Sequence, residues 1–75
     1  MAAGTVVALG EASLVEGYRL VGASVRAVED PTSVLDAWQS LPAGTALVVL
    51  TPRAAGVLGA RVLDPDAPLT VVMPS

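Results

Sequence analysis

Few side chains in this sequence could do acid, base or nucleophilic chemistry, and the main candidates are carboxylates. Glu29 and Asp30 form the only adjacent pair of acids. General acid–base catalysis needs two carboxylates in one cleft with separated pKa values. Asp30 precedes Pro31, and an Asp cap followed by Pro at the first helical position is typical of a helix start. Helix capping therefore accounts for Asp30, and we predict no catalytic residue.

Other kinds of site lack the residues that they need. The chain has no cysteine, no histidine and no lysine, which excludes thiolate metal sites, the commonest general base and Schiff-base chemistry. Its glycines form neither G-x-G-x-x-G nor a P-loop. Asp64 and Asp66 offer too few oxygen ligands for a calcium loop and fit a turn around Pro65. We expect no cofactor, no metal and no enzyme activity.

Composition limits the size of the fold and its surroundings. The 75 residues predict a single domain over 1–75, with 53% hydrophobic and 15% charged residues. Four arginines against seven acids give a net charge of −3, which disfavours nucleic acid and anionic membrane surfaces as partners. The longest apolar run, 46–50, is far short of a membrane span. Without a signal-peptide pattern at the N-terminus, we expect a cytoplasmic protein with no direct membrane insertion.

Apolar runs alternate with helical patterns along the chain. Apolar residues at three- and four-residue spacing indicate a helix over 11–21, stopped by Gly22. A second helix begins at Asp30-Pro31 and ends near Pro42, with Trp38 in its core stripe, and a weaker third helix begins at Thr51-Pro52. The predicted strands are 5–9, 24–28 at an edge, 46–50 as the most buried strand, and 69–73. This β-α-β-α-β-α-β order predicts a parallel sheet with right-handed crossovers.

The segment after the first strand resembles a known family. It matches the pattern G-D/E-x-x-x-V-x-G-F/Y-R-L-x-G of the F subunits of V-type (archaeal and bacterial A/V-type) rotary ATPases, and 71–75 is similar to the last strand of that family and its I-P-S exit. Members of the family continue into a C-terminal segment whose helix reaches the catalytic head, so the resemblance covers only the globular part. The matching positions are Gly10, Glu11, Val15, Gly17, Tyr18, Arg19, Leu20 and Gly22.

The resemblance implies a three-layer α/β/α fold with strand order 2-1-3-4, similar to flavodoxin and receiver domains, but without the final helix. Right-handed crossovers then place the first helix on one face and the other two on the opposite face. We therefore expect an apolar, uncovered surface over strands three and four, which is typical of a partner site. Two alternating sets could form it: Leu47, Val49, Leu69, Val71 and Met73, or Ala46, Val48, Leu50, Thr70 and Val72.

The function implied by the resemblance is that of a non-catalytic central-stalk component, peripheral to the membrane through its complex. Such a component binds the coiled-coil D-type stalk protein, with the ATPase head as a second contact, and helps transmit torque in ATP-coupled ion transport. The alternative is a stand-alone receiver-like interaction or regulatory domain, with a homodimer as one way to cover the bare face. Phosphorelay chemistry is excluded, because the acidic pair, the phosphate-accepting aspartate and the lysine of receivers are missing. The expected partner-binding residues are Tyr18, Arg19, Val71, Val72 and Met73.

Several residues of the matching segment have two interpretations. Gly17 inside a helix indicates either close approach of another backbone, that of a partner or of this protein's own sheet, or simple internal packing. Tyr18 is either an interface anchor or the largest core residue of its helix. Arg19 either faces a partner or is a solvated residue that pairs with Glu16. Glu11 is expected to favour the positive end of the first helix.

Overall fold

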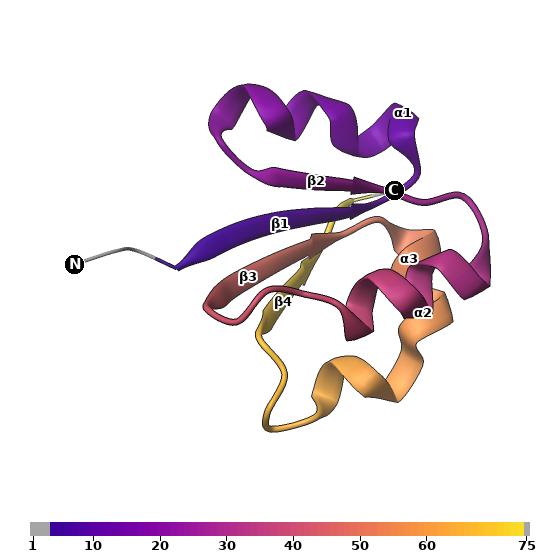
Figure 1. Ribbon diagram of the computed structural model, residues 1–75. Helices are drawn as coiled ribbons and strands as arrows, with labels where there is room; N and C mark the ends of the chain where they lie inside the picture. Colours follow the sequence, from indigo (N-terminus) through magenta and orange to yellow (C-terminus); the bar gives the residue numbers. More distant parts are fainter. Residues whose placement is uncertain (1–3, 75) are drawn as a thin grey trace.

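The sheet is parallel throughout and has the predicted strand order. In the computed structural model, which describes residues 4–74, its strands are β1 (Thr5–Gly10), β2 (Ser24–Ala27), β3 (Thr45–Leu50) and β4 (Leu69–Val72). They lie in the order β2-β1-β3-β4, and each neighbouring pair is parallel (Figure 1). The predicted α/β fold with order 2-1-3-4 is therefore confirmed, with β2 at an edge.

Helical segments lie on both faces of this sheet but divide unequally. The first crossover contains α1 (Ala12–Val15) and the 3₁₀ helix η1 (Glu16–Val21), which pack mainly over β1 and β2. The α-helices α2 (Pro31–Gln39) and α3 (Pro52–Leu58) lie together on the opposite face, and α3 continues into the 3₁₀ helix η2 (Gly59–Leu63) (Figure 1). Within residues 4–74, no helix is long and apolar enough to cross a membrane.

The predicted starts of α2 and α3 are confirmed in atomic detail. The Asp30 carboxylate accepts hydrogen bonds from the Ser33 backbone N–H and hydroxyl, at 3.1 and 2.8 Å. The Thr51 hydroxyl accepts one from the Ala54 N–H at 3.2 Å. Each cap satisfies a backbone donor that has no partner inside the helix, and Pro at the next position loses no hydrogen bond there.

The first helical segment differs from the continuous helix predicted over 11–21. Only Ala12–Val15 is α-helical, and the rest winds as a 3₁₀ helix. Val15 is fully buried, whereas η1 has no buried residue, so little packing holds that part in α geometry, and Gly17 weakens it further. Gly22 ends the segment as predicted, in the left-handed region with φ 89°.

The main core lies between the sheet and the α2–α3 layer. Leu9, Val48 and Leu50 of the sheet meet Val34 and Ala37 of α2 and Ala54 and Leu58 of α3, with Trp38 packed against them as predicted. On the other face, Val15 and Ala8 are fully buried. The prediction that the third strand is the most buried was wrong, because β1 is buried over its last four residues while β3 alternates between buried and less buried positions.

Two glycines of the matching segment have opposite surroundings. Gly10 has φ +153°, and a Cβ atom placed there would overlap the side chain of Thr51, which is itself fully buried. A Cβ on Gly17 would meet nothing within 4 Å. The own-sheet contact and the internal packing considered for Gly17 are therefore absent from the described structure, whereas Gly10 is required by close approach between the ends of β1 and β3.

This contrast gives a paired prediction for stability. Gly10→Ala should lower the free energy of unfolding by about 1–3 kcal/mol, because the added methyl forces Thr51 to move. Gly17→Ala should raise it by about 0.5–1 kcal/mol, because alanine favours a helix and the site is open. Urea unfolding of both variants against the wild type measures the two effects. Equal destabilisation by both substitutions would contradict the packing described at Gly10.

Candidate protein-interaction face

One side of the sheet has apolar strands without a closely packed helix over them. On the side of α1 and η1, these helices contact β1 and β2, and the remaining helices of residues 4–74 lie on the other side (Figure 1). This leaves β3 and the edge strand β4 bare on the α1 side, as the topology predicts. A parallel sheet is usually covered on both faces, so the bare region is the candidate functional surface.

The structure also shows which side chains form this surface. Val48 and Leu50 of β3 belong to the core beneath α2 and α3, and side chains alternate along a strand, so Leu47 and Val49 face the opposite way. The register pairs Leu47 with Leu69 and Val49 with Val71, and paired residues of neighbouring strands share a face. We call Leu47, Val49, Leu69 and Val71 the open face.

The open face belongs to the first of the two sets that the sequence left possible. Leu69 and Val71 are 76% and 52% exposed, while Leu47 and Val49 are half-buried. Met73 continues the alternation beyond the end of β4 and is half-buried. Val72 pairs with Leu50 and so lies on the α3 side, yet it is 50% exposed because β4 is at the edge. The binding role of Val71, Val72 and Met73 stays a prediction, and for Val72 it would require a partner that contacts the α3 side of β4.

A hollow joins the open face to η1. It has a volume of about 430 Å³ and lies between the sheet residues Val6 and Val49 and the η1 residues Tyr18 and Val21. We call it the side pocket. Val49 belongs to both surfaces, so the side pocket and the open face are continuous. None of the side chains that line either of them is charged.

The η1 residues that sequence analysis singled out lie at the border of this surface. Tyr18 is half-buried and lines the side pocket, so it packs in part against its own fold, and its role as an interface anchor stays a prediction. Arg19 forms a solvent-exposed ion pair with Glu16, with 3.0 Å between Nη2 and Oε1. Such a pair contributes about 0.2–0.5 kcal/mol. It keeps the guanidinium on the helix surface, and a partner-facing role for Arg19 stays a prediction.

A polar cluster that includes Glu11 and Thr51 lies at the carboxyl ends of β1 and β3. The Thr51 hydroxyl donates a hydrogen bond to Oε1 of Glu11, and this bond is the main cause that lowers the pKa of Glu11. Sequence analysis missed this contact, because the two residues are 40 positions apart. Glu11 lies at the start of α1, as expected, and its side chain makes no cap hydrogen bond there. Oε2 of Glu29 accepts the Ala12 N–H instead, at 3.0 Å.

These carboxylates are used for helix capping and for loop contacts. Glu29 caps α1, and Asp30 caps α2, where hydrogen bonds from Ser33 lower its pKa. Asp64 accepts the Asp66 N–H at 2.9 Å, which is the turn predicted around Pro65. In the part of the chain that the structure describes, no group of three acidic residues is placed to hold a metal ion.

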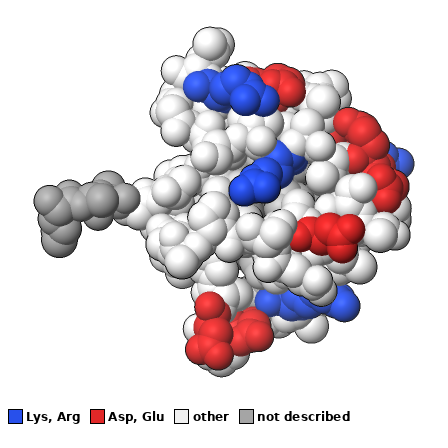
Figure 2. Space-filling view, in the orientation of Figure 1, with Lys and Arg blue, Asp and Glu red and all other residues white. Residues whose placement is uncertain are grey.

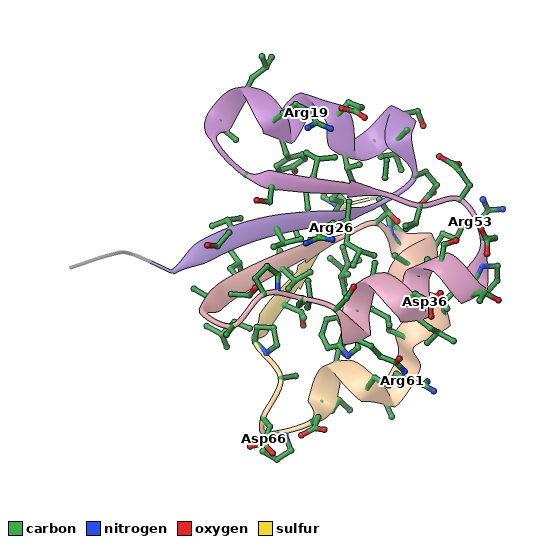
Figure 3. The ribbon with its side chains drawn as sticks, viewed as in Figure 1. Arg19, Arg26, Asp36, Arg53, Arg61 and Asp66 are labelled. Carbon is green, nitrogen blue, oxygen red and sulfur yellow. The ribbon has the colours of Figure 1, made fainter. Side chains whose placement is uncertain are left out.

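Charged side chains are scattered over several elements. On the side of the molecule that is in view, Figure 2 shows acidic and basic residues singly or in small groups. Arg19, Arg26, Arg53 and Arg61 lie on η1, β2, α3 and η2, and Figure 3 shows them far apart. Since these four are the only basic side chains of the chain, it has no continuous basic stripe of the kind that nucleic-acid binding uses.

No protein-family model matches the sequence, and no curated protein matches it.

The Thr51 contacts give a prediction for stability. Thr51→Val keeps the shape of this buried side chain but removes the acceptor for Ala54 and the donor for Glu11. We expect the free energy of unfolding to fall by about 1–2 kcal/mol. Thr70→Val is the control, because Thr70 is half-buried on β4, and it should change stability by less than about 0.5 kcal/mol. Equal effects in urea unfolding would contradict the role of Thr51.

The lowered pKa values of Glu11 and Asp30 give a pH dependence. A carboxyl whose folded pKa is below its unfolded value stabilises the fold above the unfolded pKa, which is about 4 for both residue types. This stabilisation is lost as pH falls through the folded pKa, so unfolding should become easier as the pH falls below about 4. Glu11→Gln should show a shallower dependence. Unfolding midpoints that stay constant on acidification would contradict the proposed hydrogen bonds.

Proposed function

We propose that this chain is a non-catalytic rotor component similar to the F subunits of V-type ATPases. In this role it docks on the coiled-coil stalk protein of the D type, with the ATPase head as a second contact. It transmits torque between ATP turnover in the head and ion movement in the membrane ring. The observation that carries the proposal is the uncharged open face on a sheet of order β2-β1-β3-β4.

The positions that match the family pattern support this proposal, because the fold uses only some of them. Gly10, Glu11, Val15 and Gly22 have structural explanations in the close approach to Thr51, a hydrogen bond, a buried contact and a helix end. The other matching positions line the side pocket or are exposed. Leu20 is 91% exposed, and Gly17 and Arg19 also face solvent. A surface role accounts for residues that the core does not need.

The mechanism of this role is steric. A parallel sheet with a close-packed core on its α2–α3 side is a stiff body, because protein interiors have crystal-like packing and low compressibility. Apolar contact between the open face and a stalk helix would hold this body against the shaft. Rotation of the shaft then carries the docked chain with it instead of bending one part against the other. In this role no side chain of the protein takes part in a chemical reaction.

Affinity purification from the membranes of the source cell tests the proposal. A chain tagged at its N-terminus should co-purify with a coiled-coil stalk protein and the large head subunits. Recovery alone, as a homodimer, or with an unrelated regulator would overturn the rotor role. Recovery with an unrelated regulator would instead support the alternative of a stand-alone interaction domain.

Two neighbouring valines provide a matched test of the docking surface. Val71 and Val72 are 52% and 50% exposed but lie on opposite sides of β4. Val71→Asp should abolish co-purification, because it places a charge on the uncharged open face, where docking would bury it without a partner. Val72→Asp should retain co-purification. Circular dichroism shows whether each variant is folded, and loss of binding in Val72→Asp alone would place the interface on the α3 side.

A further inference from the structure

Within the proposed docking role, the open face and the side pocket differ in shape. The open face is two strands wide, and strand spacing of about 4.8 Å makes it about 10 Å across. This matches the diameter of one α-helix with its side chains, about 10–12 Å. On one side η1 stands above the sheet with Tyr18 and Val21 toward the side pocket, and on the other side the sheet ends at β4. We call the open face and the side pocket together the shelf, with the sheet as its floor and η1 as its one wall.

We propose that this shelf receives a single amphipathic helix of the partner, and that one large apolar side chain of that helix fills the side pocket beside Tyr18. The inference rests on the proposed docking to a coiled-coil protein. The lining of the open face and the side pocket has no charged side chain, which matches the apolar stripe of an amphipathic helix and disfavours a charged loop. Val49 connects the two surfaces, so one helix can contact both.

A second copy of the chain fits this shelf less well than a helix. The four open-face residues form a floor two strands wide, and η1 stands beside this floor. The wall formed by η1 would hold a second flat sheet away from the floor. A helix can lie against the wall and the floor together.

The side pocket gives the docked helix its register. A Leu, Met or Phe side chain fills a hollow of this kind, and a side chain that is fully desolvated in a well-packed pocket contributes strongly to binding. Tyr18 offers an apolar ring as the wall, with its hydroxyl available for a hydrogen bond at the rim. Tyr18 and Val21 are thus specificity-determining residues, whereas the exposed Leu63 on η2 lies in the opposite helical layer.

Titration calorimetry with the purified coiled-coil stalk protein of the same organism tests the pocket. Val49→Phe should fill the side pocket and weaken binding by about tenfold or more, which corresponds to about 1.4 kcal/mol. Val21→Ala removes part of the wall and should weaken binding several-fold. Since Val21 is 78% exposed, it remains informative if Val49→Phe does not fold. Leu63→Ala is the matched control, since Leu63 is 79% exposed, and it should bind as the wild type. Unchanged affinity in Val21→Ala and in folded Val49→Phe would overturn the pocket.

Photocrosslinking distinguishes failure of this inference from failure of the rotor role. A benzophenone amino acid at position 21 should crosslink to a large apolar residue within a helix of the stalk protein, and one at position 63 should not. Crosslinks to a loop of the stalk protein, or only from position 63, would overturn the helix in the shelf and leave the rotor role intact. Crosslinks to a second copy of this chain would overturn the helix in the shelf in favour of a homodimer. Failure of the stalk protein to bind the wild type at all would overturn both proposals.

Discussion

The unequal division of helices between the two faces of the sheet determines the rest of this structure. The first right-handed crossover, from β1 to β2, places α1 and η1 on one face of the sheet. The next two crossovers, to β3 and β4, run the opposite way across the sheet and so place α2 and α3 on the other face. As a result β1 is covered on both sides, whereas β3 and β4 are covered on one. Leu69 and Val71 are apolar, as expected for strand residues that face one side of a sheet. They are exposed because the helices on that side cover β1 and β2 instead. An interaction surface arises here without any special loop.

The polar residues at the reversal point have a structural use. In open α/β sheets, ligands bind beyond the carboxyl ends of the strands where the strand order reverses. In this chain that place is the junction of β1 and β3, where Thr51 packs against Gly10 and donates to Glu11. Thr51 is fully buried and also caps α3. Thr51 and Glu11 bond to each other there and hold the loops after β1 and β3 together.

Local sequence signals predicted the fold well, whereas features that depend on contacts between distant segments could not be predicted. Asp30-Pro31 and Thr51-Pro52 indicate helix starts because capping involves residues three positions apart, and Gly22 marks a helix end for a similar reason. The change from α to 3₁₀ winding after Val15 depends on how little of η1 is buried, which sequence spacing does not show. The choice of Leu47 and Val49 for the open face required the packing of α2 and α3 against Val48 and Leu50. The Glu11–Thr51 bond, the Glu29 cap and the side pocket join segments distant in sequence, and no local pattern indicates them.

The layer that borders the open face is also the least tightly packed helical layer. A domain of this size buries about 60% of the surface of its unfolded chain, so its stability is small and sensitive to each covered strand. η1 has no buried residue, and its Leu20 and Val21 are largely exposed. A helix on the shelf would cover Val49 and Val71 and pack against Tyr18 and Val21 at once. Since a ligand that binds only the folded state stabilises it, docking would strengthen the side of the molecule on which its own helices provide the least cover. Under the proposed role, the shaft-bound chain would be more stable against unfolding than the free chain.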